Sequence, residues 1–140
     1  MRVVLDTNVV ASAILWGGAP RQLLQAARKK RIEIFSSMPM LAEFADILGR
    51  RKFARQLAAS LLTIDQIVER YAQLTSVVRP VATPRIAPDP DDDMVIGTAL
   101  AAKAAFVVTG DKPLLSIADY QGVRIVGVTQ AIEIINAGSR

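Results

Sequence analysis

The sequence of 140 residues contains no cysteine and no histidine. Without cysteine there is no disulfide framework and no thiolate zinc site. Without histidine the chain lacks the side chain that most often serves as a general base near neutral pH and as a transition-metal ligand. Catalysis by this chain would therefore depend on carboxylates, hydroxyls, amines and a bound metal ion.

The sequence also lacks a long apolar run, since no stretch approaches the roughly 18 residues of a membrane-spanning helix. Hydrophobic residues make up 51% of the chain and charged residues 21%, as in globular proteins. The first predicted strand begins at residue 2, without the charged and apolar leader of a secreted protein. We therefore expect a cytoplasmic protein with a single domain over residues 1–140.

Basic residues outnumber acidic ones, with 17 Lys and Arg against 13 Asp and Glu and a net charge of +4. This surplus suits an anionic partner but does not identify one. The cluster at 28–31 ends a predicted helix, where it complements the helix dipole. A second cluster surrounds Phe53 at a break between predicted helices and is the predicted substrate-facing patch: Arg50, Arg51, Lys52 and Arg55.

Short apolar segments alternate with helical patterns along the chain. Predicted strands lie near residues 3, 33, 78, 107 and 124. Because strand-helix-strand crossovers are right-handed, this alternation predicts an α/β fold with a five-stranded parallel sheet and helices on both faces, in three α/β/α layers.

Acidic residues follow two of the predicted strands. Asp6 ends the first strand and is followed by Thr7 and Asn8, while Asp111 comes after Thr109 at the end of the strand near 107. Ligands of parallel α/β sheets bind beyond the carboxyl ends of the strands. We therefore expect both acids at one edge of the sheet.

Further acids lie where helices begin near the same edge. Glu43 lies on the helix after the second strand, and the segment 89–93 opens an apolar helix with four acids in five residues. Such acids repel one another unless a cation neutralises part of their charge. Asp93 is the predicted metal ligand from this segment, and Asp91 or Asp92 could share the metal-binding role. Four carboxylates without histidine or cysteine suit Mg²⁺ or Mn²⁺ rather than zinc: Asp6, Glu43, Asp93 and Asp111.

With these motifs the sequence resembles PIN-domain nucleases, particularly the toxin components of VapBC-type toxin–antitoxin pairs. The resemblance rests on the motifs at 4–8, 17–20, 43, 89–93 and 109–112. It implies that Asp6, Glu43, Asp93 and Asp111 are catalytic and bind metal, with supporting roles for Thr7, Asn8, Thr109, Asp91 and Asp92. Pro113 stands where many members of the family carry another acid.

The resemblance also implies a reaction and partners. The reaction is hydrolysis of RNA phosphodiester bonds with Mg²⁺ or Mn²⁺, leaving 5′-phosphate and 3′-hydroxyl ends. The implied partners are an RNA substrate, a cognate antitoxin and a second copy of the chain in a homodimer. The predicted RNA-binding residues are then Arg50, Arg51, Lys52 and Arg55. Two alternatives are a phosphoacceptor receiver module, which also has an acidic Mg²⁺ pocket at a sheet edge, and a PIN fold that binds RNA without cleaving it.

Overall fold

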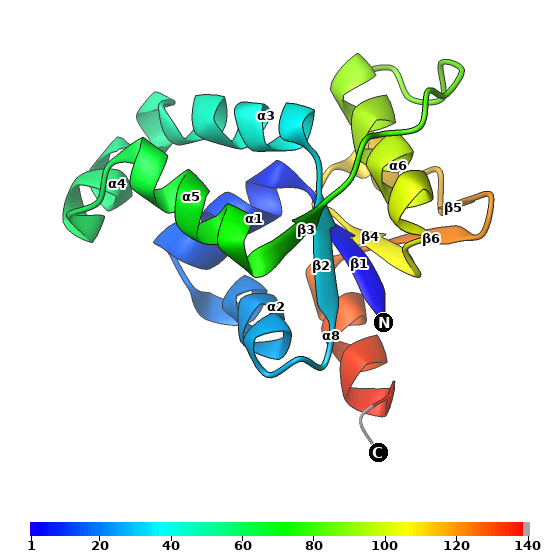
Figure 1. Cartoon of the computed structure of the whole chain (residues 1–140), viewed down its shortest axis with the longest axis horizontal. Coiled ribbons are helices and arrows are strands. Elements are labelled where there is room, and N and C mark those ends of the chain that lie inside the picture. The colour runs from blue at the N-terminus through cyan, green and yellow to red at the C-terminus, as the bar shows by residue number, and fades with distance from the viewer. Residues whose placement is uncertain (139–140) are drawn as a thin grey trace.

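A computed structural model describes residues 1–138, in which one sheet of six strands forms the centre (Figure 1). The strand order is β3-β2-β1-β4-β6-β5. The strands are β1 (Arg2–Leu5), β2 (Glu33–Ser36), β3 (Thr75–Val77), β4 (Phe106–Val108), β5 (Asp119–Tyr120) and β6 (Val123–Val126).

The sheet is parallel apart from β5, which pairs antiparallel with β6. The predicted α/β fold is confirmed, but the number of strands is six rather than five. The extra strand, β5, has two residues, too few to produce a periodic pattern in the sequence. The strand predicted near 78 lies slightly earlier, at Thr75–Val77.

Helices cover both faces of the sheet (Figure 1). One face packs against α1, α2, α3, α5 and α8, and the other against α6 and α7. The helices are α1 (Thr7–Leu15), α2 (Gly18–Arg28), α3 (Met38–Leu48), α4 (Ala54–Ser60), α5 (Ile64–Leu74), α6 (Pro90–Ala102), α7 (Lys112–Leu115) and α8 (Val128–Gly138), with the 3₁₀ turn η1 (Arg51–Phe53) before α4.

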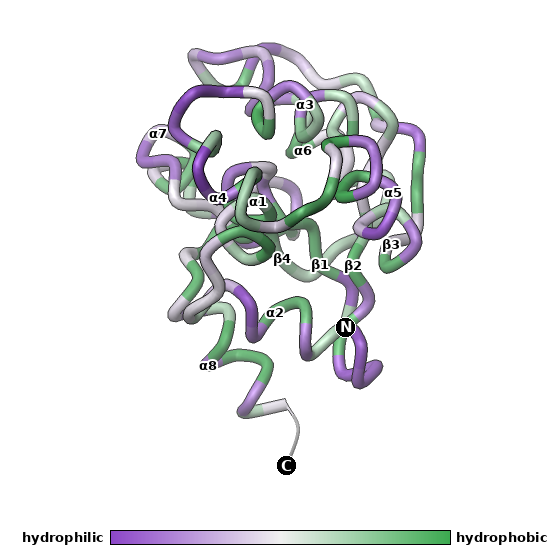
Figure 2. Tube along the Cα trace, turned by 90° about the vertical axis from the view of Figure 1, so that its left-hand side faces the viewer, coloured by the Kyte–Doolittle hydropathy of each residue, from purple (hydrophilic) through white to green (hydrophobic). Residues whose placement is uncertain are grey.

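Two apolar cores separate these layers, because successive side chains of a strand point to opposite faces. In β1, Val3 and Leu5 belong to the larger core and Val4 to the smaller one. Figure 2 shows the central strands among largely apolar stretches. Burial on both faces explains why β1 has a continuous rather than an alternating apolar pattern.

Side-chain caps fix where several helices begin. Ser37 accepts a hydrogen bond from the Met40 N–H at the start of α3, and Thr63 forms a capping box at the start of α5. The last helix, α8, begins at Val128, and Thr129 lies within its first turn. Within residues 1–138, no helix is long and apolar enough to span a membrane.

Candidate active site

The candidate active site lies at the carboxyl edge of the sheet, where β1 and β4 end side by side. Asp6 follows β1 and caps α1. Its Oδ1 accepts a hydrogen bond from the Thr7 backbone N–H at 2.8 Å, and its Oδ2 accepts one from the Thr109 hydroxyl at 2.7 Å. The Thr109 Oγ1 in turn accepts from the Asp111 N–H at 3.0 Å. Thr109 therefore ties the two strand-end acids together.

A hollow of about 270 Å³ opens at this edge between α3 and the start of α6. Figure 1 shows these two helices beyond the upper ends of β1 and β2. The hollow brings together acids that are up to 105 positions apart in the sequence. Its lining residues are Asp6, Asn8, Glu43, Arg50, Pro88, Asp89, Asp91, Asp92, Asp111 and Pro113.

Burial and neighbouring charges disfavour ionisation of Glu43. The pKa of Glu43 is raised to about 7, chiefly by burial of the carboxyl group and then by the charges of Asp91 and Asp6. Glu43 lies in the middle of α3, and its side chain nevertheless reaches the hollow. The sequence predicts that Glu43 lies at the same edge of the sheet as Asp6, and in the structure both residues line this hollow.

Asp92 has a similar environment. Its pKa is raised to about 7, chiefly by burial and then by a hydrogen bond with the Asp111 side chain and by the charges of Asp111 and Asp6. The pKa of Asp6 is also raised by burial, although its hydrogen bonds with Thr109 and Thr7 oppose the rise. The site as a whole therefore favours an added positive charge, whether a proton or a metal cation.

Asp93, the predicted ligand of the 89–93 segment, lies outside this cluster. Its Oδ1 accepts hydrogen bonds from the backbone N–H groups of Ile86 and Ala87, at 3.1 and 2.8 Å, and its Oδ2 lies 3.7 Å from Arg85 Nε. Only 14% of the Asp93 side chain is exposed. Asp93 thus anchors the loop before α6, and the neighbouring Asp92 occupies the place predicted for Asp93.

Two other acids of the segment border the hollow and are exposed. Asp89 caps α6 by accepting a hydrogen bond from the Asp91 N–H at 3.0 Å, and its charge contributes to the raised pKa values of Glu43 and Asp92. Asp91 belongs to the predicted supporting residues, whereas Asp89 does not. The sequence signal for the capping role of Asp89 is its position directly before Pro90, because proline is a frequent first residue of a helix.

The chemistry of these side chains fits a hard divalent cation, because the donors are carboxylate oxygens. Burial raises the pKa of Asp6, Glu43 and Asp92 among them. Each Asp6 oxygen retains acceptor capacity beyond its bonds to Thr7 and Thr109. Within residues 1–138, however, no three acidic side chains converge closely enough to hold a metal ion as they stand. Cation binding would therefore require the carboxylates to draw together.

A second hollow of about 380 Å³ adjoins the first and shares Asp6, Asn8 and Asp111 with it. Trp16 and Ser12, neither of which is a predicted site residue, also line this hollow. The remaining lining residues are Lys52, Phe53 and Gly110. The sequence signal for Trp16 is its spacing of four residues from Ser12 and eight from Asn8, but its place beside Asp6 also requires that α1 continue to its C-cap at Trp16.

The four predicted RNA-binding residues fall into two pairs. Arg50 lines the first hollow and forms an exposed ion pair with Asp46 at 3.8 Å. Lys52 lines the second hollow, where its Nζ donates to Asn8 Oδ1 at 3.4 Å. Arg51 and Arg55 are exposed and line neither hollow. Half of the predicted patch thus reaches the site.

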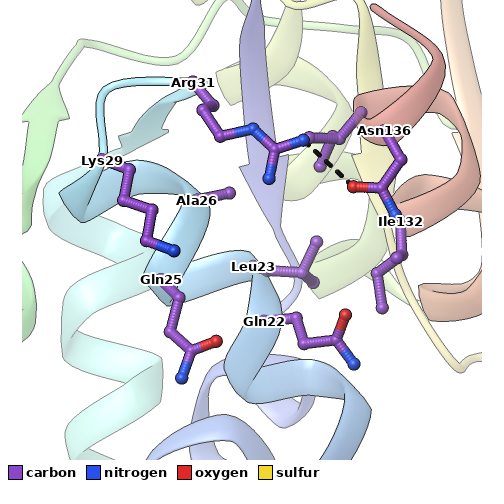
Figure 3. A pocket seen from close by; sticks show the side chains of 9 residues that line it. Gln22, Leu23, Gln25, Ala26, Lys29, Arg31, Ile132 and Asn136 are labelled. Atoms are coloured by element: carbon purple, nitrogen blue, oxygen red, sulfur yellow. Dashed lines mark hydrogen bonds between the residues drawn. The ribbon is translucent and has the colours of Figure 1, made fainter. Parts of the chain in front are cut away.

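Another hollow, of about 260 Å³, lies between α2 and α8 (Figure 3). Lys29, Arg31 and three amide side chains surround its apolar floor, and Arg31 donates a hydrogen bond to Asn136 Oδ1 at 3.0 Å. None of its lining residues is acidic. Since Arg31 precedes β2, this hollow lies toward the opposite edge of the sheet and takes no part in the carboxylate site.

Comparisons with known proteins agree with this arrangement. A family model described as PIN domain matches residues 2–113. The chain is 28% identical over 120 residues to the uncharacterized protein MJ1680 of Methanocaldococcus jannaschii, covering 85% of this chain and 76% of that protein. It is also similar to a chain in the crystal structure of VapBC2 from Rickettsia felis bound to a DNA fragment from their promoter, with a TM-score of 0.60, 16% identity and coverage of 91% of this chain and 98% of that chain. At this identity the likeness shows a shared fold.

Proposed function

Because the chain belongs to the PIN domain family, we propose that it is a divalent-metal-dependent endoribonuclease. Family membership makes it a nuclease at the family level and contradicts the receiver-module alternative. The observation that carries the proposal is the carboxylate cluster, in which Glu43 and Asp92 have pKa values of about 7 beside Asp6. The repulsion among these acids is relieved when a cation neutralises part of their charge.

We propose that Asp6, Glu43, Asp92 and Asp111 hold the metal ion, which is Mg²⁺ or Mn²⁺. Asp92 replaces Asp93 in this set, because the carboxylate of Asp93 is engaged with the loop at Ile86 and Ala87. Thr7 and Thr109 orient Asp6 by donating to its two oxygens, so that its remaining lone pairs are available for a cation. These groups correspond to a metal ligand and its orienting partners.

The bound cation would polarise the scissile phosphodiester and lower the pKa of the attacking water. Arg50 and Lys52 bring positive charge to the margin of the two hollows, where they would contact the phosphates flanking the cleaved bond. Water rather than the ribose 2′-hydroxyl is the nucleophile in this reaction. The products are therefore expected to carry 5′-phosphate and 3′-hydroxyl ends.

We also propose that the protein is the toxin of a toxin–antitoxin pair, with residues 1–140 as a single PIN domain and a homodimer as the working form. The support is the shared fold with a chain of the VapBC2 structure. Expression of the chain should arrest growth of a bacterial host, and co-expression of a small protein encoded beside it should restore growth. Growth that is unaffected by the wild-type chain would argue against the toxin role while leaving the nuclease chemistry open.

The test of the chemistry is cleavage of single-stranded RNA by the purified protein. Cleavage should require Mg²⁺ or Mn²⁺, stop on addition of EDTA and be abolished by Asp6→Asn. The variant should remain folded, because asparagine can still accept from Thr7 and pair with Thr109 and one repelling charge is removed. Equal cleavage with and without EDTA would refute the proposal. The alternative of a non-catalytic RNA-binding scaffold predicts RNA binding without cleavage under all these conditions.

A further inference from the structure

Trp16 presents an aromatic ring to the second hollow beside the carboxylates. Its side chain is 50% exposed, and it is the only tryptophan in the sequence. Its ring lies 5.1 Å from that of Phe53, centroid to centroid, with the planes tilted by 54°. Since Phe53 is buried, it supports part of the Trp16 ring and leaves the rest open to solvent.

The position of Trp16 follows from the length and phase of α1. Asn8, Ser12 and Trp16 recur every four residues, so they lie along one side of the helix, and all three line the second hollow. With a rise of 1.5 Å per residue, the eight positions from Asn8 to Trp16 span about 12 Å. The hollow therefore extends from the Asp6 carboxylate at the start of α1 to the aromatic ring at its end.

The backbone around Trp16 holds the ring in this place. The Trp16 N–H donates to the Ser12 carbonyl at 3.0 Å and so continues the helix. The chain then turns at Gly17, whose φ of 85° suits glycine. Arg21 secures the turn by donating to the carbonyls of Ala13 and Ile14, both at 3.2 Å. The ring is thus attached to a fixed helix end rather than to a free loop.

The other groups of the hollow suit a nucleotide. Lys52 places its Nζ 3.4 Å from Asn8 Oδ1 and 5.0 Å from the centroid of the Phe53 ring. Its ammonium group can bind a phosphate, while the Asn8 amide and the Ser12 hydroxyl can both donate and accept hydrogen bonds at a base edge. Proteins that bind single-stranded nucleic acids combine such cations with aromatic rings on which bases stack.

Building on the nuclease function proposed above, we propose that Trp16 forms a base-stacking subsite for the single-stranded RNA substrate. A nucleobase next to the scissile phosphate stacks on the exposed part of the Trp16 ring, and Lys52 contacts the adjoining phosphate. Stacking is tolerant of sequence because every base has a π face. The subsite therefore favours unpaired RNA over duplex RNA, whose bases are already stacked on one another.

Intrinsic fluorescence tests the stacking directly, because Trp16 is the sole tryptophan. The protein used is the Glu43→Gln variant in Mg²⁺, which is expected to bind RNA without cleaving it and in which every residue lining the second hollow is unchanged. A single-stranded oligoribonucleotide should quench the fluorescence in a saturable titration. An abasic oligonucleotide of the same length should bind through its phosphates without this quenching. Equal quenching by both ligands, or none by either, would overturn the proposal.

A matched pair of substitutions separates stacking from packing. Trp16→Phe and Trp16→Leu both cover Phe53 with an apolar side chain, but only phenylalanine offers a π face. In the Glu43→Gln background, the leucine variant should bind the oligoribonucleotide about 5- to 150-fold more weakly than the parent, and the phenylalanine variant should recover most of this loss. Equal affinities of the two variants, with unchanged melting temperatures, would overturn the subsite and leave Trp16 as a contact for a protein partner.

Cleavage by proteins with an intact Glu43 distinguishes failure of the subsite from failure of the nuclease function. If the wild-type chain cleaves RNA and Trp16→Leu raises KM with a smaller change in kcat, both proposals stand. If the wild-type chain cleaves RNA and Trp16→Leu behaves as wild type, the subsite is wrong while the nuclease function stands. If wild type does not cleave but Glu43→Gln shows quenching that depends on bases, the nuclease proposal fails and the RNA subsite stands.

Discussion

At the scale of single residues, two adjacent aspartates at the start of α6 have different surroundings. Successive residues of an α-helix are about 100° apart around its axis, so the Asp92 and Asp93 side chains leave α6 in different directions. Asp92 reaches the Asp111 carboxyl, whereas Asp93 accepts two backbone hydrogen bonds from the preceding loop. Asp92 therefore lines the candidate active site, whereas Asp93 holds the loop before α6.

Substitution of each aspartate by asparagine should separate these roles. Asp92→Asn is expected to lower metal-dependent cleavage by more than about 10-fold, since loss of a group that merely orients a metal ligand already costs about 10- to 100-fold. Its melting temperature in metal-free buffer should not fall, because the substitution removes a repelling charge. Cleavage rates and thermal melts on the same preparations provide both measurements.

Asp93→Asn is the matched control and should show the opposite pattern. Weakening its charge-assisted hydrogen bonds to Ile86 and Ala87 should lower the free energy of unfolding by about 1–3 kcal/mol, while the folded protein keeps its metal-dependent cleavage. A stable but inactive Asp93→Asn variant would return the metal-binding role to Asp93, as the resemblance to the PIN family first implied.

At the scale of elements, α6 is positioned by close contact with the chain before it. The Val81 N–H donates to the Gly97 carbonyl at 3.0 Å. A Cβ added at Gly97 would lie only 2.4 Å from the Val81 carbonyl oxygen, and a backbone atom cannot move aside as the end of a side chain can. Glycine at this position therefore lets the loop lie against α6, and the loop in turn presents its N–H groups to Asp93.

Gly97→Ala is consequently expected to destabilise the fold by about 1–3 kcal/mol, the usual cost of overpacking. Gly110→Ala is a suitable control, since a Cβ there would meet nothing within 4 Å and the residue has no positive φ. Denaturant unfolding of both variants measures the difference. Equal stabilities would show that the contact between the loop and α6 is readily displaced.

The segment 50–55, which runs from just before η1 into α4, contains the predicted RNA-binding residues at two distances from the site. Arg50 and Lys52 line the hollows, whereas Arg51 and Arg55 do not. The double variants Arg50→Ala/Lys52→Ala and Arg51→Ala/Arg55→Ala remove the same charge. The first should lower the salt dependence of RNA affinity by about 1.4 in the log–log slope, at about 0.7 for each single-strand phosphate contact.

The second double variant should leave that slope nearly unchanged, with little effect on which sequence is cut in either case. The measurement is RNA affinity over a series of salt concentrations, in the Glu43→Gln background to prevent cleavage. Equal changes in slope for the two pairs would indicate that the whole segment acts as a diffuse basic surface rather than through the residues that line the hollows.

At the scale of the whole molecule, the carboxylate edge opposes folding when it is fully ionised. The pKa values of Glu43 and Asp92 rise from ordinary values of 4.5 and 3.8 to about 7 in the folded protein. The folded state thus binds protons more tightly than the unfolded state in this interval. By linkage, the stability that this tighter binding provides is present at low pH and is lost as the pH rises through about 7.

The metal-free protein should therefore melt at a lower temperature at about pH 8 than at about pH 5, and Glu43→Gln/Asp92→Asn should flatten this dependence. Saturating Mg²⁺ should restore stability at the higher pH, because a ligand that binds only the folded state stabilises it. Calorimetry with and without Mg²⁺ checks both statements. A wild-type melting temperature that rises between these pH values without metal would contradict the assignment of the repelling cluster.

The sequence by itself determined the fold class, because alternating apolar and helical segments have few ways to bury their surfaces. It also determined that Asp6 and Asp111 meet, since the carboxyl ends of parallel strands share an edge. It could not place Asp92 rather than Asp93 in the hollow, because that choice depends on the rotation of α6 against the loop at Ile86. Nor could it bring Trp16 beside Asp6 or separate Lys52 from Arg51. Those positions depend on how helices pack around the sheet, and only the tertiary structure decides that packing.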